Sequence, residues 1–191
     1  VALGGYRGLF GRVIGADDWV LRLVSAYQRA LGGDERPFLL YGHSAGGQFT
    51  ARFLVKHPEQ VKRAVISSAA TYPQPAPDVA WPFGMGELHT DLSWDDGTVT
   101  RVDEIPSEEE WLAATEVEVM VIGGLNDTSE LPPYPGQEGK NRFTIGHNWV
   151  KEMAALAERH GQASRIEIEM IPGKGHSMSG LIEYSQSALL P

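Results

Sequence analysis

The chain contains no cysteine, which excludes disulfide bonds, thiolate metal sites and a cysteine nucleophile. Secreted and cytosolic proteins can both lack this residue, so the sequence leaves the localisation undecided. Basic residues are also few, with 16 lysines and arginines against 25 acidic residues and a formal net charge of −9. The sequence contains no run of basic residues within this excess of acidic ones. A phosphate backbone would therefore be repelled, and we expect no nucleic-acid partner.

Long apolar runs are missing as well. The longest cover only a handful of residues, whereas a helix that crosses a bilayer needs about 20. The first fifteen residues lack the charged start and apolar core of a signal peptide, so we expect a soluble chain without membrane contact. Histidines and acids form no H-E-x-x-H or similar cluster, and we therefore expect neither a metal site nor a cofactor.

What is present indicates one α/β domain over residues 1–191. The chain is 42% hydrophobic, enough for a single core of ordinary size. Apolar runs predict strands, and helical spacing of apolar residues predicts helices between them. The strands are expected at 38–41, 61–67, 117–122 and 165–171, and the helices at 16–31, 45–57, 145–160 and 178–190. This alternation predicts a mostly parallel sheet flanked by helices.

Residues 72–110 interrupt the alternation. The segment is rich in proline, glycine, aspartate and tryptophan and has no sustained period, which is typical of a lid-like excursion over the carboxyl edge of the sheet. A loop that only connects two elements is the alternative. Its aromatic residues Trp81, Phe83 and Trp94 are candidates for an apolar substrate pocket, with core packing as the other explanation. Trp111 and Trp149 lie in helical segments and are expected in the core.

The strongest motif is Gly42-His43-Ser44-Ala45-Gly46, a G-x-S-x-G pentapeptide between an apolar strand and an amphipathic helix. In that setting Ser44 is expected to be a nucleophile in a strained turn, where side chains at Gly42 or Gly46 would collide with the neighbouring strand and helix. The N–H of Ala45, at the start of the helix, can face a developing oxyanion. His43 flanks the nucleophile and is a candidate substrate contact.

A serine nucleophile needs a base and an acid that orients the base. His176 lies in the glycine-rich stretch PGKGHS directly after the last predicted strand, and Asp127 ends GGLND after the strand before it. We expect His176 to be the base and Asp127 its acid. Glu130 is the alternative acid, and an ordinary turn residue is the alternative role for Asp127. The order Ser44, Asp127, His176 is the order of the triad in this class of fold.

The segments GHSAGG, GGLNDT and GKGHS together resemble the α/β-hydrolase superfamily over the whole chain. More narrowly, YGHSAGGQF, VKRAVISSAATYP, WPFGMG and GKNRF are similar to bacterial poly(3-hydroxybutyrate) depolymerase-like hydrolases. This resemblance implies hydrolysis of a small-molecule or polymeric ester through an acyl-enzyme. A thioesterase or acyltransferase with the same triad, and a binding protein that retains the fold without catalysis, remain as alternatives.

The chain departs from this family at its start. Four strands normally precede the nucleophile in the family, but only about forty residues precede Ser44 here. The stretch Val1 to Val13 lacks the family's His-Gly pair, so the second oxyanion donor stays unassigned. The strand at 38–41 has no charge or proline that would protect an exposed edge. We therefore expect N-terminal strands to be missing from this chain, and the bare edge to pair with that segment or with another chain.

Overall fold

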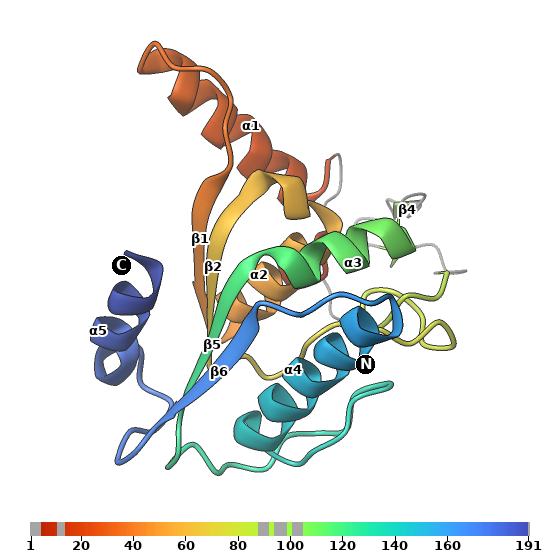
Figure 1. The fold of residues 1–191 in the computed structure, drawn as a ribbon, viewed down its shortest axis with the longest axis vertical. Helices are drawn as coiled ribbons and strands as arrows, with labels where there is room; N and C mark the ends of the chain where they lie inside the picture. The colour runs from red at the N-terminus through yellow and green to blue at the C-terminus, as the bar shows by residue number, and fades with distance from the viewer. Residues whose placement is uncertain (1–4, 11–13, 88–91, 94–98, 101–104, 191) are drawn as a thin grey trace.

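The computed structural model describes residues 5–10, 14–87, 92–93, 99–100 and 105–190 (Figure 1). Its helices are α1 (Ala16–Ala30), α2 (Ala45–Lys56), α3 (Glu108–Glu116), α4 (Arg142–Arg159) and α5 (Met178–Leu189). Its strands are β1 (Phe38–His43), β2 (Val61–Ser67), β3 (Leu92–Ser93), β4 (Val99–Thr100), β5 (Glu118–Gly124) and β6 (Ile166–Ile171). Two short 3₁₀ turns, Gly5–Gly8 and Pro58–Gln60, complete the described elements.

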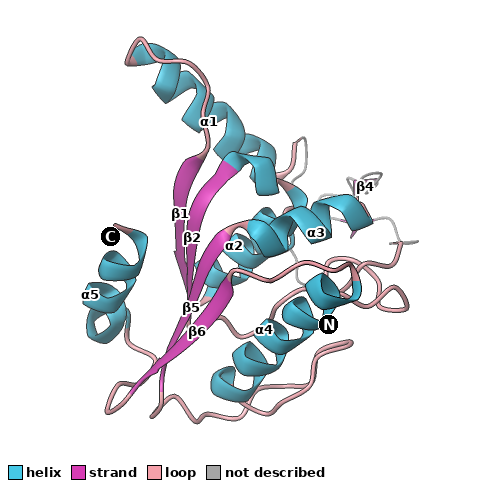
Figure 2. Cartoon of the chain, viewed as in Figure 1, coloured by secondary structure: helices cyan, strands magenta, loops and turns pink. Residues whose placement is uncertain are grey.

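Four strands form one parallel sheet in the order β1-β2-β5-β6. Helices α2, α3 and α4 lie on one side of this sheet and α5 on the other (Figure 2). Strands β3 and β4 form a separate antiparallel pair. Because each parallel strand is followed by a helix that returns to the starting edge, all four carboxyl ends meet at one edge of the sheet. This is the α/β fold that the alternation of the sequence predicted.

Two layers of apolar side chains hold the helices on the sheet. The larger core includes the fully buried Phe53, Trp111 and Trp149, and Trp149 Nε1 donates a 2.7 Å hydrogen bond to the Pro73 carbonyl. The placement of both tryptophans in the core is confirmed. The smaller core, under α5, consists of Val65, Ile122, Ile171 and Leu181. Within the described ranges, no helix has both the length and the apolar character needed to cross a bilayer.

The interruption between β2 and β5 differs from the prediction at its end. Helix α3 begins at Glu108, so the last three residues of the predicted excursion are helical. A capping box starts this helix: the Ser107 side chain accepts from the Glu110 N–H, and the Glu110 carboxylate accepts from the Ser107 N–H. The spacing Ser-x-x-Glu is visible in the sequence and would have identified the start. A second capping box, between Asn141 and Thr144, starts α4 three residues before the predicted position.

Helix α1 forms as predicted, but one apolar stripe of it faces outward. Trp19, Leu23 and Tyr27 are 65%, 70% and 63% exposed, while Val20 and Leu21 pack against the larger core. The helix extends beyond the sheet, next to β1, which is the edge strand among the described residues (Figure 1). The amphipathic pattern therefore identified the helix but not the side that packs.

A buried ion cluster attaches the start of α1 to the end of α2. Asp17 is fully buried, and its Oδ2 accepts hydrogen bonds of 2.8 Å from Lys56 Nζ and His57 Nε2. Burial alone would raise the pKa of Asp17, but the hydrogen bonds and charges of His57 and Lys56 outweigh it and lower the pKa from 3.8 to about 2. The carboxylate therefore stabilises the fold above about pH 4, and this contribution is lost as the pH falls through 2.

We expect Asp17→Asn to lower the free energy of unfolding by about 2 kcal/mol at pH 7, because the pKa difference between the folded and unfolded states is about two units. The gap between the variant and the parent should narrow as the pH falls from 5 towards 2. Urea unfolding across this pH range measures it. The exposed neighbour Asp18 provides the control, and an Asp17→Asn variant as stable as Asp18→Asn at pH 7 would contradict the prediction.

Candidate active site

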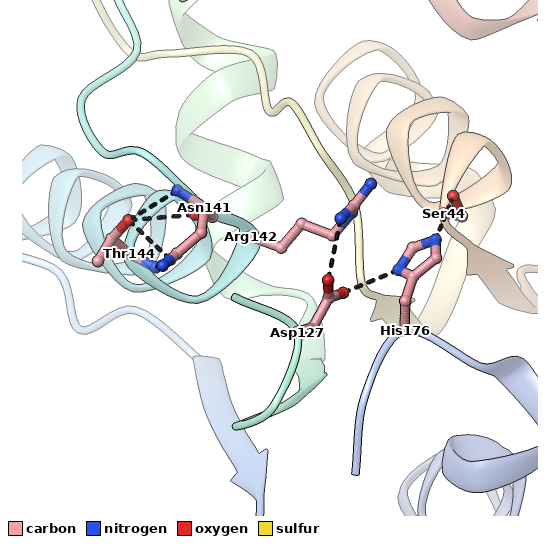
Figure 3. Close-up of polar contacts among 6 residues, drawn as sticks. All are labelled: Ser44, Asp127, Asn141, Arg142, Thr144 and His176. Atoms are coloured by element: carbon pink, nitrogen blue, oxygen red, sulfur yellow. Dashed lines mark hydrogen bonds and ion pairs between the residues drawn. The ribbon is translucent and has the colours of Figure 1, made fainter. Parts of the chain in front are cut away.

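The carboxyl edge of the sheet brings Ser44, His176 and Asp127 together (Figure 3). Ser44 follows β1, Asp127 follows β5 and His176 follows β6. His176 Nε2 lies 3.0 Å from Ser44 Oγ, and His176 Nδ1 lies 2.8 Å from Asp127 Oδ2. These are hydrogen-bond distances. With Nδ1 donating to the carboxylate, the imidazole presents Nε2 to the serine hydroxyl as an acceptor.

The backbone at Ser44 adopts a conformation that few residues other than glycine take, with φ 54° and ψ −112°. Its N–H donates to the Ser67 carbonyl at 2.8 Å, so the end of β2 holds the turn in place. The turn needs glycine at position 42, where a Cβ would lie 2.2 Å from the carbonyl oxygen of Gly46. Strain held in this way by the surrounding structure is common at functional sites.

The expectation of a collision at Gly46 is wrong for the described structure. A Cβ at Gly46 would meet no described atom within 4 Å, whereas at Gly47 it would lie 3.0 Å from the Ser67 carbonyl and 3.1 Å from the Ala69 side chain. The tight contact between helix and strand therefore falls one residue later than the pentapeptide motif indicates. The pentapeptide contains no signal for this shift, because it depends on how α2 rotates against β2.

Ala45 is the first residue of α2. The N–H groups of the first helical turn have no acceptor within the helix and carry the positive end of the helix dipole. The Ala45 N–H, directly after the serine, is therefore available to a negatively charged oxygen bound at Ser44.

The loops that carry Asp127 and His176 are joined by their backbones. The Asn126 N–H donates to the Lys174 carbonyl at 2.8 Å, and the Leu125 N–H donates to the Ile171 carbonyl at 3.0 Å. A Cβ at Gly124 would lie 2.3 Å from the Lys174 carbonyl oxygen, so this approach requires glycine. Asp127 itself is 5% exposed and contacts His176, whereas the alternative acid, Glu130, is exposed to solvent.

His43 lies beside His176. Its Nδ1 is 3.0 Å from Ser67 Oγ, and its ring centroid is 5.1 Å from that of His176. Burial lowers the pKa of His43, and the neighbouring His176 ring and the Arg142 guanidinium lower it further. A neutral, half-buried His43 can accept or donate one hydrogen bond in the site without adding charge to it.

Two of the aromatic residues of the excursion, Trp81 and Phe83, are buried. Trp81 is 1% exposed and belongs to the larger core, and Phe83 is 8% exposed and stacks on Tyr134 with ring centroids 5.9 Å apart. In this structure Trp81 is therefore a core residue, as the alternative explanation expected. Trp94 lies outside the described residues.

A buried arginine holds this segment against α2. Arg52 is fully buried and donates to the carbonyls of Pro82 and Gln48 at 2.8 and 2.9 Å and to Thr71 Oγ1 at 3.2 Å. Burial, with a smaller contribution from the positive charge of Arg7, lowers the pKa of Arg52 to about 9. Since α2 begins directly after Ser44, these hydrogen bonds connect the excursion to the helix whose first N–H follows the serine.

Sequence reasoning missed two side chains of the site, Ser67 and Arg142. Arg142 Nη1 lies 3.0 Å from Asp127 Oδ1, the carboxylate oxygen that does not face His176. Its position at the start of a helix after a long loop is visible in the sequence, but its partner is not. Among the described residues, no group of three or more histidines and acids is arranged to hold a metal ion.

Comparison with known proteins identifies the family. The model of the family described as serine aminopeptidase, S33, matches residues 4–100, just over half of the chain. No curated protein matches the sequence. Among solved structures, the fold is similar to poly(aspartic acid) hydrolase-1 from Sphingomonas sp. KT-1, with a TM-score of 0.76 and 21% identity, and to the poly(3-hydroxybutyrate) depolymerase LpqC from Bordetella parapertussis, with 0.71 and 19%.

The match covers 95% of this chain and 66% of the poly(aspartic acid) hydrolase, and 90% of this chain and 58% of the depolymerase. The chain therefore spans less than two thirds of either structure. At these identities the likeness shows a shared fold, which is that of the α/β-hydrolases. From the match of the family model, supported by this fold, the chain belongs to the serine aminopeptidase S33 family of α/β-hydrolases.

Proposed function

We propose that this hydrolase cleaves carboxylic esters through an acyl-enzyme, with Ser44 as nucleophile, His176 as general base and acid, and Asp127 as the orienting carboxylate. The observation that carries the proposal is the unbroken row of hydrogen bonds from Ser44 Oγ through His176 to Asp127, at 3.0 and 2.8 Å. A serine hydroxyl alone is a weak nucleophile, and a base within hydrogen-bond reach is what activates it.

In the proposed reaction, Ser44 Oγ attacks the ester carbonyl carbon while His176 Nε2 takes the hydroxyl proton. The oxyanion of the tetrahedral intermediate faces the Ala45 N–H, and Asp127 stabilises the imidazolium from its other side. The C–O bond then breaks, and His176 returns the proton to the leaving alcohol. Water, deprotonated by His176, attacks the acyl-enzyme; the bond to Ser44 Oγ breaks, His176 returns the proton to Oγ, and the acid is released.

The proposed substrate is a small-molecule or polymeric ester. Poly(3-hydroxybutyrate), the polymer named for one structural neighbour, is a polyester, and poly(aspartic acid), named for the other, is linked through amide carbonyls. The same residues could also serve thioester hydrolysis or acyl transfer, since these reactions differ only in the leaving group or in the acceptor of the acyl group. His43, beside the base, is the proposed substrate contact among the described residues.

Labelling with a fluorophosphonate probe tests the nucleophile directly, because the probe reacts covalently with activated serines. We expect one adduct per chain, mapped by peptide mass spectrometry to Ser44 and missing in Ser44→Ala. The exposed Ser177, next to His176, is the matched control, and Ser177→Ala should label like the parent. An unlabelled parent that folds cooperatively would instead support a binding protein that retains the fold.

The substrate class needs a second experiment, on folded protein that has not been treated with the probe. We expect p-nitrophenyl butyrate to be hydrolysed with a kcat/KM at least tenfold above that for the matching butyryl thioester and for a p-nitroanilide. A preference for the thioester would replace the esterase proposal with a thioesterase, and a preference for the anilide would replace it with an amidase. Formation of butyryl glycerol when glycerol is added would reveal acyl transfer.

A further inference from the structure

The carboxylate of Asp127 is buried between two donors. Its side chain is 3% exposed; Oδ2 faces His176 Nδ1 at 2.8 Å, and Oδ1 accepts from Arg142 Nη1 at 3.0 Å (Figure 3). No other hydrogen-bond partner of this carboxylate occurs among the described residues. A buried carboxylate needs partners for both oxygens, and a charged partner compensates it more fully than a neutral one.

In the resting site, Arg142 is the cation that compensates Asp127. His176 must be neutral to act as a base, so it offers the carboxylate one N–H and no charge. The guanidinium carries a permanent charge. If this charge were removed, the buried carboxylate would favour the imidazolium form of His176, which cannot accept the proton of Ser44.

The backbone around Arg142 is built to hold it in place. Arg142 is the first residue of α4, and the capping box between Asn141 and Thr144 fixes the helix start, with the Thr144 N–H donating to Asn141 Oδ1 at 3.0 Å. The next turns of α4 are fastened to the core by Ile145 and Trp149, which are 1% and 0% exposed. The side chain of Arg142 is itself only 17% exposed. It therefore approaches the carboxylate from a rigid support.

A contribution to stability alone is a poor explanation for the position of Arg142 beside Asp127. Its Nε is buried and has no hydrogen-bond partner among the described residues, and a buried polar group without a partner destabilises the fold. A buried ion pair is often no more stable than apolar residues of the same volume. An arrangement that keeps such an imperfectly bonded charge beside the acid is better explained by its effect on Asp127 and His176.

We propose that Arg142 is a positioning residue for the triad: its guanidinium orients the Asp127 carboxylate towards His176 and compensates its charge, which favours the neutral form of His176. This inference rests on the proposed serine hydrolase function. The other groups that face His176 are Ser44 and His43 from the end of β1 and Asp127 from the loop after β5. Arg142 acts through Asp127 and need not touch the substrate.

Three variants separate the charge of Arg142 from its hydrogen bond. Arg142→Met removes both, Arg142→Gln keeps a donor without charge, and Arg142→Lys keeps the charge. The control is Arg159→Met at the exposed end of the same helix. For p-nitrophenyl butyrate, we expect Arg142→Met to lower kcat about 10- to 100-fold with KM changed less than about threefold, and to move the acid limb of the kcat/KM profile up by about one pH unit.

Arg142→Gln should show the same move of the acid limb with a smaller loss of kcat, and Arg142→Lys and Arg159→Met should keep the acid limb of the parent. A folded Arg142→Met or Arg142→Gln with the acid limb of the parent would overturn the inference, as would an effect confined to KM. If Arg142→Met does not fold, judged by its thermal melt, Arg142→Gln and Arg142→Lys give the same comparison.

Titration of the His176 imidazole by NMR gives a readout that needs no turnover. Its midpoint should rise by about one pH unit in Arg142→Gln and stay near that of the parent in Arg142→Lys. An unchanged midpoint in Arg142→Gln overturns the inference even if the parent hydrolyses esters. Conversely, a parent that neither labels at Ser44 nor hydrolyses any ester would overturn the proposed function, whatever the titration of His176 shows.

Discussion

Ser44→Ala, His176→Ala and the double variant should all hydrolyse p-nitrophenyl butyrate at about the same low rate, roughly 10⁴ to 10⁶-fold below the parent. In the proposed mechanism the serine and the histidine act as one unit: without the base the hydroxyl stays a weak nucleophile, and without the hydroxyl the base has no proton to take. Removing the second residue after the first should therefore lower the rate of hydrolysis almost no further. The residual rate would come from substrate binding and from the proposed oxyanion donor, the Ala45 N–H.

Steady-state kinetics with purified variants measures this effect, and a thermal melt of each variant confirms that it is folded. His147→Ala, an exposed histidine on α4, and Ser177→Ala, an exposed serine beside the base, are the matched controls and should retain the rate of the parent. Two single losses that multiply in the double variant would indicate that Ser44 and His176 act independently, contrary to the proposed mechanism.

Gly42→Ala should lower the free energy of unfolding by about 3 kcal/mol, the upper range for an added group in a packed interior. A Cβ there would lie 2.2 Å from the Gly46 carbonyl oxygen and 2.3 Å from Thr50 Oγ1. The carbonyl belongs to the first turn of α2, so the clash can be relieved only by moving the helix away from β1. The hydroxyl of Ser44, which lies between them, would move too, and labelling by the fluorophosphonate should fall with the stability.

Gly46→Ala is the matched partner of this variant. Its Cβ would meet no described atom within 4 Å, and alanine is favoured over glycine inside a helix by about 1 kcal/mol. We therefore expect Gly46→Ala to be as stable as the parent or slightly more stable in urea unfolding. Equal losses of stability in Gly42→Ala and Gly46→Ala would show that position 42 is packed no more closely than position 46. The backbone geometry described for this turn would then be wrong.

The order of elements and the composition of the site could be predicted because they depend on local patterns. A short apolar run followed by GHSAGG indicates a strand, a turn and a helix without knowledge of any other segment. In a parallel sheet the carboxyl ends of the strands share one edge, so Ser44, Asp127 and His176 could be expected to lie near one another from their positions after three strands. The helix α3 could also have been found, from the capping signal at Ser107.

Contacts between distant segments could not be predicted in this way. Nothing local to Asp17 indicates that Lys56 and His57 will surround it, since the three meet only when α1 crosses the end of α2. The aromatic spacing of α1 predicted its apolar side but not that Trp19 would be exposed, because exposure depends on what the neighbouring strand leaves uncovered. The sequence did not decide whether Trp81 lines a pocket or packs in the core. In the structure Trp81 is buried, next to Pro82, whose carbonyl accepts a hydrogen bond from Arg52.

By itself, the sequence determined that this chain is an α/β protein with a serine, an acid and a histidine that each follow a strand, because periodicity and turn chemistry act over a few residues. Only the tertiary structure decided that the acid has a second partner in Arg142, that Gly47 rather than Gly46 is tightly packed, and that one side of α1 lies open. These features depend on the distances and rotations between packed elements, which arise when the whole chain is folded.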